Sequence, residues 1–259
     1  MKAQVTLTPA EGKRLIAHCV ANMEAVRKAY REGILVVATG TTNAYLVEEL
    51  TGLELPDKGM FTAGVVTGEA ASITVAEGRY KHRVYEGGSM VECTTGELVP
   101  FLARMGPEDV FVKGANAIDP YGDAGILVHG GGGGTIGAAW GHLVRNGVQV
   151  VIPVGLDKMV PVSLRDVAGE MGVGRIDKSL GFPCGLFVVH GDVVTEVEAF
   201  RRLFQVEAFP VAGGGIHGGE GARVFLLEGS EEGVEAAYEY VLSIKGEPPL
   251  ETRTMKASS

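Results

Sequence analysis

Two short segments of the sequence combine glycine and threonine in a way that suits a bound anion. The first is residues 39–42 (TGTT), and the second is five consecutive glycines at 130–134 followed by a threonine. Glycines allow positive φ and close ligand approach, and their N–H groups can point one way to form a nest. Each segment precedes a helical pattern, whose positive dipole end favours negative charge. We therefore expect both loops to bind a phosphate or carboxylate; plain helix capping and a tight strand-to-helix crossing are the structural alternatives.

Ionisable residues follow the predicted strands closely, at the edge where open α/β sheets bind ligands. Asp119 and Asp123 lie in the segment after one strand, and His129 precedes the glycine run. Carboxylates and imidazole can transfer protons, so we expect these three to be the catalytic residues. The alternative for Asp119 is turn initiation with Pro120. The residues expected to bind the ligand are Thr39, Gly40, Thr41, Thr42, Lys113, Asn116, Gly130, Gly131, Gly132, Gly133, Gly134, Thr135 and Lys158.

The histidines and cysteines do not suggest a metal or cofactor site. None of the six histidines is in an H-x-x-x-H or H-E-x-x-H arrangement, so we expect no metal centre and no cofactor. The three cysteines, Cys19, Cys93 and Cys184, are far apart and odd in number. This pattern favours buried thiols in a reducing cytoplasm over a disulfide framework.

The elements that must position these residues alternate between strand and helix. Short apolar runs at 34–40, 109–114 and 148–155 read as strands buried on both faces. Helical patterns cover 8–33, which opens with a capping box, as well as 41–52, 94–106 and 135–147. This alternation predicts an α/β fold with a mostly parallel, Rossmann-like sheet and flanking helices.

The last third of the chain has a different order of predicted strands and helices. Residues 184–246 read in the order β, α, β, β, α, which predicts a smaller α+β, ferredoxin-like lobe. We expect an anion-binding core at 1–165, the lobe at 166–246, and a loose polar tail at 247–259.

The amino-acid composition limits the classes of binding partner that we expect. The 259 residues carry a net charge of −9, so a chain-wide basic footprint for nucleic acid is absent. No apolar run of about 18 residues suggests a membrane span, and the N-terminus has no signal-peptide core, so we expect a cytoplasmic protein. A small anionic metabolite is the expected partner, and exposed apolar helix faces could form a homo-oligomer.

Four motifs in order give the chain a resemblance to a known superfamily. Residues 39–50 (TGTTNAYLVEEL), 113–117 (KGANA), 129–133 (HGGGG) and 155–160 (GLDKMV) resemble the phosphate-loop, D-G-A-D-E, K-G-G-G-G and lysine motifs of type A ribose-5-phosphate isomerases. That superfamily also contains glucosamine-6-phosphate deaminases, DeoR-type effector domains and CoA transferases. The resemblance covers roughly residues 10–165, and it implies a sugar-phosphate site and a ferredoxin-like lobe.

The departures from this pattern concern the catalytic residues. Lys113 and Asn116 stand where the isomerases have acidic residues, and His129 replaces the lysine before the glycines. Residues 138–140 (AAW) stand where the isomerases have their catalytic glutamate. The resemblance therefore implies a phosphate cradle without the isomerase's proton shuttle, and we do not expect classical ribose-5-phosphate isomerase activity.

Three functions stay open from the sequence. The chain binds a small phosphorylated or otherwise anionic metabolite in each of them. It is an isomerase-like enzyme with altered catalytic residues, a non-catalytic metabolite sensor, or a CoA transferase-like enzyme with Glu69 or Glu86 as nucleophile. Whether the protein is an enzyme at all is thus left to the structure and to experiment.

Overall fold

A six-stranded mixed sheet forms the centre of the molecule. The computed structural model describes residues 1–255. The strand order is β12-β10-β7-β2-β5-β6. The first four strands pair in parallel, β5 pairs antiparallel with β2, and β6 pairs antiparallel with β5. The α/β class and the mostly parallel sheet are therefore confirmed. The strands are β2 (Ile34–Val37), β5 (His82–Glu86), β6 (Ser89–Cys93), β7 (Val110–Val112), β10 (Gln149–Pro153) and β12 (Asp192–Val194).

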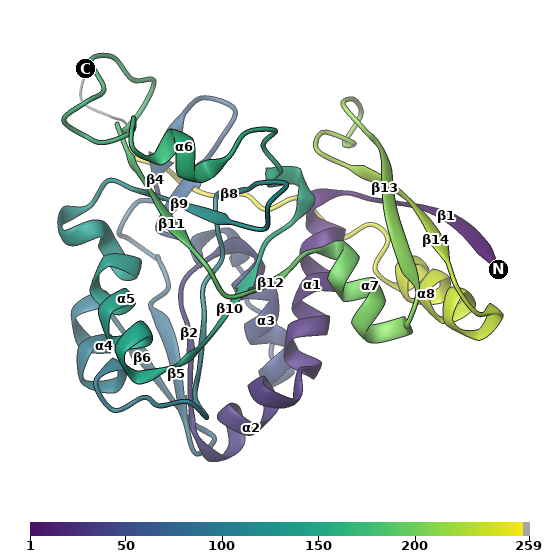
Figure 1. Cartoon of the computed structure of the whole chain (residues 1–259), viewed down its shortest axis with the longest axis horizontal. Coiled ribbons are helices and arrows are strands. Elements are labelled where there is room, and N and C mark those ends of the chain that lie inside the picture. The colour runs from purple at the N-terminus through teal and green to yellow at the C-terminus, as the bar shows by residue number, and fades with distance from the viewer. Residues whose placement is uncertain (256–259) are drawn as a thin grey trace.

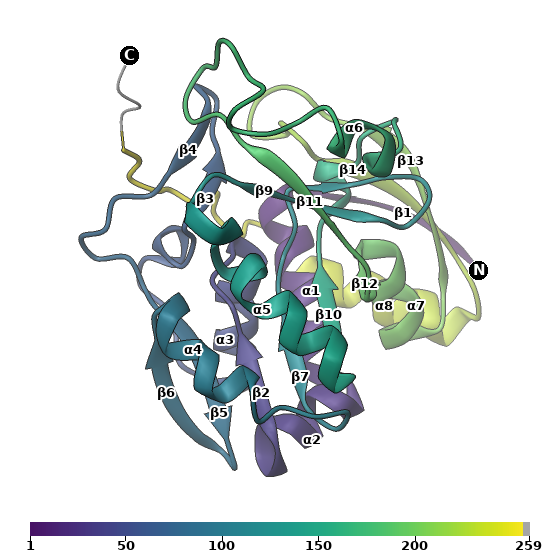
Figure 2. The ribbon, with the colours of Figure 1, turned by 60° about the vertical axis from the view of Figure 1, so that its left-hand side comes forward.

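Helices cover both faces of this sheet (Figures 1 and 2). The helices α1 (Pro9–Asn22), α2 (Glu24–Glu32) and α3 (Thr41–Thr51) pack on one face, and α4 (Thr95–Leu102) and α5 (Gly134–Asn146) pack on the other. Val110 and Val112 belong to the first apolar cluster and Phe111 to the second, as strand alternation requires. Among residues 1–255, no helix has both the length and the apolar character needed to cross a bilayer.

The first predicted helix is present but broken. Thr8 and Glu11 form the predicted capping box at the start of α1. The chain leaves helical geometry at Met23, where ψ is 133°, and α2 starts at the next residue. The Asn22 side chain donates to the carbonyl of His18 at 2.8 Å, so a side chain competes with the backbone at this point. The periodic pattern continues across the break, which explains why the sequence predicts one helix.

A smaller lobe combines the N-terminal strand with the segment 196–243 (Figure 1). Its antiparallel sheet has the order β1-β14-β13, with β1 (Lys2–Leu7), β14 (Arg223–Glu228) and β13 (Glu207–Gly213). The helices α7 (Glu196–Phe204) and α8 (Glu231–Ser243) complete it. The predicted boundary at residue 165 does not separate the two sheets, because β1 joins the lobe and β12 joins the central sheet.

Additional strands lie above the carboxyl ends of the central strands (Figure 2). An antiparallel sheet has the order β11-β9-β8, and β3 pairs with β4 in a separate hairpin. These elements are β3 (Gly64–Val66), β4 (Ala71–Ile73), β8 (Ala117–Ile118), β9 (Ala124–Val128) and β11 (Gly185–Val189), with the short helix α6 (Leu164–Ala168) beside them.

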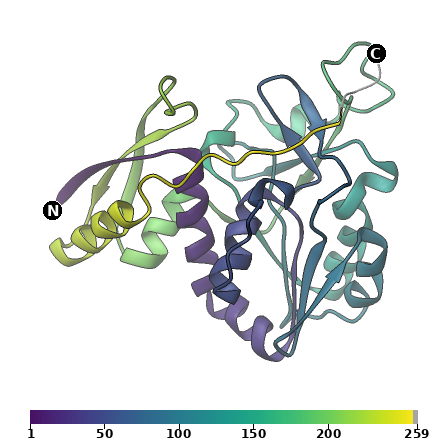
Figure 3. The ribbon, with the colours of Figure 1, turned by 180° about the vertical axis from the view of Figure 1, so that it is seen from behind.

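The segment after α8 is packed, in contrast to the expected loose tail. It crosses the molecule from the small lobe to strand β4 (Figure 3). The amide of Gly246 donates to Glu11 at 3.0 Å, and the amide of Met255 donates to the carbonyl of Ile73 at 2.7 Å. Gly59 lies directly under this crossing, because a Cβ there would be 1.7 Å from the carbonyl oxygen of Glu251. Residues 256–259 of the expected tail lie outside the described residues.

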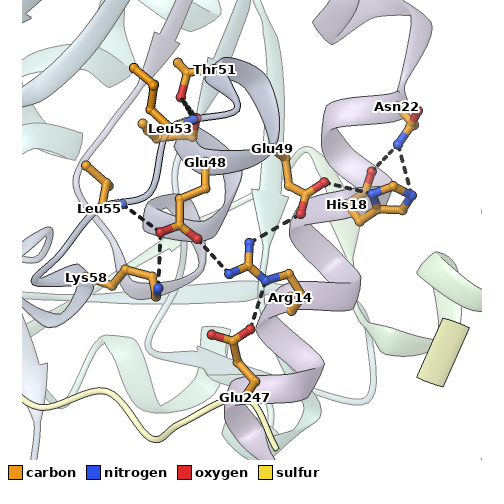
Figure 4. Close-up of polar contacts among 11 residues, drawn as sticks. Arg14, His18, Asn22, Glu48, Glu49, Thr51, Leu53, Leu55, Lys58 and Glu247 are labelled. Atoms are coloured by element: carbon orange, nitrogen blue, oxygen red, sulfur yellow. Dashed lines mark hydrogen bonds and ion pairs between the residues drawn. The ribbon is translucent and has the colours of Figure 1, made fainter. Parts of the chain in front are cut away.

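An ion-pair network fixes the start of this crossing segment (Figure 4). Arg14 of α1 donates to Glu48 at 2.7 Å, to Glu49 at 3.3 Å and to Glu247 at 3.1 Å. Its guanidinium also stacks over Tyr45, 4.5 Å from the ring centroid. Arg14, Glu48 and Glu247 are each less than a fifth exposed, so this network joins α1, α3 and the crossing segment out of full contact with water.

Candidate functional site

A cavity of about 1020 Å³ opens where β2, β7 and β10 end. The amino-terminal ends of α3 and α5 form two of its walls. The β3–β4 hairpin, the crossing segment, and Gly218 and Glu220 from the β13–β14 connection complete it. The volume is at the upper end of the range for small-molecule sites, so a metabolite of nucleotide size fits. The cavity lies at the sheet edge predicted from the sequence.

The first wall is the start of α3. Thr39, Gly40, Thr41 and Thr42 all line the cavity. The amide of Thr39 donates to Nδ1 of His82 at 2.9 Å, and that of Gly40 donates to the carbonyl of Phe61 at 2.7 Å. Within residues 1–255, the amides of Thr41 and Thr42 have no acceptor, and no side chain caps α3. The N–H groups of Thr41 and Thr42 are therefore available to bind an anion.

The second wall is the glycine run that leads into α5. Gly130, Gly133, Gly134 and Thr135 line the cavity, while Gly131 and Gly132 form the short turn beside them. Residues 132, 133 and 134 have φ of 68°, 78° and 60°. A side chain there would be strained, which accounts for the glycines of this turn. As in α3, α5 has neither a side-chain cap nor an acidic residue in its first turn.

His82 joins the two walls, and nothing in the sequence pattern singled it out. Its Nδ1 accepts from the amide of Thr39, and its Nε2 lies 3.2 Å from the hydroxyl of Thr95 and 3.3 Å from that of Thr135. Because Nδ1 is an acceptor, Nε2 carries the ring proton. Burial, together with the nearby charge of Lys113, lowers the pKa of His82 from 6.5 to about 4. His82 is therefore a neutral positioning residue.

Replacing His82 with asparagine tests this role through pH. The folded pKa of His82 lies below the unfolded value, so the unfolded state binds the proton more readily between pH 6.5 and 4. As pH falls through this interval, the unfolding free energy of the wild-type protein should therefore decrease by about 3 kcal/mol more than that of His82→Asn. Denaturant unfolding of both proteins from pH 7.5 to 4 measures the difference. Parallel curves would show that His82 is not held neutral.

Lys113 lines the cavity at the end of β7. It follows β7, whose Val112 pairs with Val37 on one side and Val151 on the other. The only hydrogen bond of its ammonium within the described chain is to the carbonyl of Gly114 at 3.3 Å. Burial lowers its pKa from 10.5 to about 8. Asn116, the other expected ligand of this segment, also lines the cavity, but its Oδ1 accepts from the amide of Leu127 at 3.0 Å.

A second charged group lies at the α1 side of the cavity. The predicted Lys158 pairs with Asp157 at 3.0 Å, and both line the cavity with Lys13 of α1. Burial and the charge of Lys158 lower the pKa of Lys13 to about 8, although Asp157 and Glu196 oppose this shift. Burial raises the pKa of Glu196, whose Oε2 accepts from the amide of Leu156 at 2.9 Å. Lys13 and Glu196 come from helix patterns far away in sequence, which is why only Lys158 was anticipated.

The three expected catalytic residues are not together. Asp119 and Asp123 are buried away from the cavity walls. Asp119 accepts from the amides of Tyr121, Asp123 and Leu164 at 2.9–3.0 Å, as the turn alternative anticipated, and Asp123 pairs with Arg165. His129 does line the cavity, and its Nδ1 donates to the carbonyl of Pro183 at 2.7 Å.

In residues 1–255, no group of three or more histidine, cysteine, aspartate or glutamate residues is arranged to hold a metal ion. The cavity lining combines helix ends, hydroxyls and lysines with the side chains of His129, Asp157, Glu220 and Glu247. Comparison with known proteins finds no matching family model and no similar curated sequence.

Proposed function

We propose that the protein is an enzyme that acts on a small phosphorylated metabolite bound in this cavity. One observation carries the proposal: two uncapped helix starts and a lysine that forms no ion pair with any of residues 1–255 line the same cavity. Helix amino-termini and ammonium groups both stabilise bound phosphate. The resemblance to sugar-phosphate isomerases supports the same ligand class and a ferredoxin-like origin of the small lobe.

The local charges support an anion despite the acidic chain. Three lysines and three carboxylates line the cavity; Lys158 pairs with Asp157, Glu247 pairs with Arg14, and Glu220 is exposed. Lys113 forms no ion pair with any described residue. A half-buried ammonium without an ion-pair partner among the described residues is costly, and a phosphate beside it would remove that cost. A phosphate bound beside Lys113 would therefore stabilise the folded protein.

The pKa values of two lysines in the cavity support catalysis over simple sensing. Lys13 and Lys113 have pKa values near 8, so each can exchange a proton close to neutral pH. Perturbed groups that converge on one cavity are typical of active sites. The transferase alternative gains no such support, because neither Glu69 nor Glu86 lines the cavity and Glu86 pairs with the surface residue Arg104.

A thermal-shift screen tests ligand class directly. Inorganic phosphate, sugar phosphates, nucleotides, CoA esters and carboxylates are each added to the purified protein. A ligand at 100 times its dissociation constant stabilises the native state by about 2.7 kcal/mol, which gives a clear shift. Stabilisation by phosphorylated compounds, with isomer or product formation by one of them, supports the proposal. A response confined to CoA esters, no response to any anion, or tight binding without turnover of any ligand bound would each contradict it.

Lys113→Met should separate binding from stability. Methionine keeps the length but removes the charge, so we expect at least a tenfold loss of affinity for inorganic phosphate. At pH 7 the same change should stabilise the free protein by about 1–3 kcal/mol, because a desolvated charge is removed. The folded pKa is the lower one, so this gain should shrink as pH rises from 8 to 10.5. Isothermal titration and denaturant unfolding measure the two effects; unchanged affinity would remove Lys113 from the site.

A further inference from the structure

The amine of Lys113 differs from the other two lysines of the cavity. Lys158 is held by Asp157 at 3.0 Å, and Lys13 donates to the carbonyl of Pro9 at 3.0 Å with two carboxylates near it. Lys113 has only a 3.3 Å contact with the carbonyl of the next residue. Its position is fixed by the backbone, since its amide donates to the carbonyl of Val151, and a Cβ on its neighbour Gly114 would lie 3.4 Å from the carbonyl oxygen of Pro153.

The surroundings of Lys113 disfavour its charged form. Phe111 faces the α5 side of the sheet, and strand alternation directs Lys113 to that side as well, toward the glycine run. His82, which contacts both walls, lies close enough to Lys113 for the lysine charge to lower the pKa of the imidazole, which stays neutral. Burial lowers the pKa of Lys113, and its ammonium forms no ion pair with any residue among 1–255 that would oppose this shift. An amine that is partly unprotonated at neutral pH is a nucleophile.

We infer that Lys113 forms a covalent imine with the carbonyl carbon of a phosphorylated aldehyde or ketone whose phosphate lies at the starts of α3 and α5. This inference rests on the proposed function and adds its reactive group. The lone pair of the Lys113 nitrogen attacks the carbonyl carbon, and the C=O π electrons move to oxygen to give a carbinolamine. The nitrogen loses its protons, the oxygen leaves as water, and a C=N bond forms. No oxidant or reductant is needed.

The imine gives the site a way to activate its substrate without the missing acidic residues. A protonated imine withdraws electrons from the bonds of the adjacent carbon more strongly than a carbonyl group does. Lys13, Asp157 and Lys158, which line the same cavity, can then act as proton donors and acceptors. The substrate class is therefore a carbonyl compound with an anionic group, and the reaction breaks or moves a bond beside the carbonyl.

Borohydride trapping tests the inference on the full-length protein. Glyceraldehyde 3-phosphate is added with sodium borohydride at pH 7.5, and modified peptides are mapped by mass spectrometry. We expect Lys113 to be labelled at least tenfold faster than any other lysine, with inorganic phosphate slowing the labelling. The initial rate should rise with pH around a midpoint near 8 rather than 10.5. Lys113→Arg should lose the adduct, whereas the surface control Lys28→Arg should retain it.

The outcomes distinguish the two proposals. If phosphate stabilises the protein but the label falls on other lysines, Lys113 is not the reactive amine and the phosphate site stands. If Lys113 is labelled equally fast by glyceraldehyde and by its phosphate, and phosphate gives no thermal shift, the reactive amine stands and the phosphate site fails. Unselective labelling of all lysines with a midpoint near 10.5 would overturn the inference whether or not the variants fold.

Discussion

Replacing Arg14 with methionine is expected to destabilise the protein by about 3–5 kcal/mol. The change leaves the buried carboxylate of Glu48 with Lys58 as its one remaining ion-pair partner, and it leaves Glu247 without one among the described residues (Figure 4). Removing one member of a buried network is costly because the remaining charges stay desolvated. Denaturant unfolding at neutral pH measures the loss, and phosphate affinity should fall as well, since the crossing segment lines the cavity.

The chain offers a matched control for this variant. Arg104 also forms a two-pronged pair, with Glu86, but both side chains are about half exposed. Exposed pairs contribute at most about 1 kcal/mol, so Arg104→Met should cost less than that. Equal effects of Arg14→Met and Arg104→Met would mean that burial of the Arg14 network does not matter. High salt should also weaken the Arg104 pair more than the Arg14 network.

Gly137→Ala should displace the glycine turn of the second wall, although Gly137 itself does not line the cavity. A Cβ at this position would lie 1.8 Å from the carbonyl oxygen of Gly132, which is backbone and cannot rotate away. The glycine turn must move, and we expect a loss of about 1–3 kcal/mol in stability and at least tenfold in phosphate affinity. Titration calorimetry and denaturant unfolding measure the two quantities.

Gly141→Ala is the control in the same helix. A Cβ there meets no atom within 4 Å, and alanine favours the helix by up to about 1 kcal/mol. This variant should therefore be slightly stabilised and should bind phosphate as the wild type does. If both alanine variants bind phosphate normally, the glycine turn is not part of the anion site.

The elements of the core could be predicted because each carries a local signal. Short apolar runs ended by glycine marked β2, β7 and β10, and the Thr8 capping box marked the start of α1. The two cavity walls were predictable for the same reason, since each wall is one contiguous segment. The break at Met23 and the place of β1 in the small lobe were not, because both depend on contacts that periodicity does not encode.

The charged part of the site could be predicted only in part. Lys113 and Lys158 follow strands directly, so their position at the sheet edge is a matter of local sequence. Lys13 comes from a helix and reaches the cavity only through the fold, and the fold likewise places His82 against Thr39 of the first wall and Glu196 against Leu156. Asp119 and Asp123 carried the same local signal as Lys113, but the turn that they form directs them to backbone amides and Arg165 instead.

The pairing of β1 with β14 has a consequence for how the chain reaches its final form. Lys2 lies opposite Glu228, so nearly the whole polypeptide must be made before this ladder can close. Contacts so distant in sequence carry a large loop-closure entropy and slow the search for the native state. Until then Val5 and Leu7 have no sheet to enter, and an unpaired apolar strand edge invites pairing with other chains. Folding at low concentration, or with a chaperone that shields residues 2–7, should therefore raise the yield of native protein.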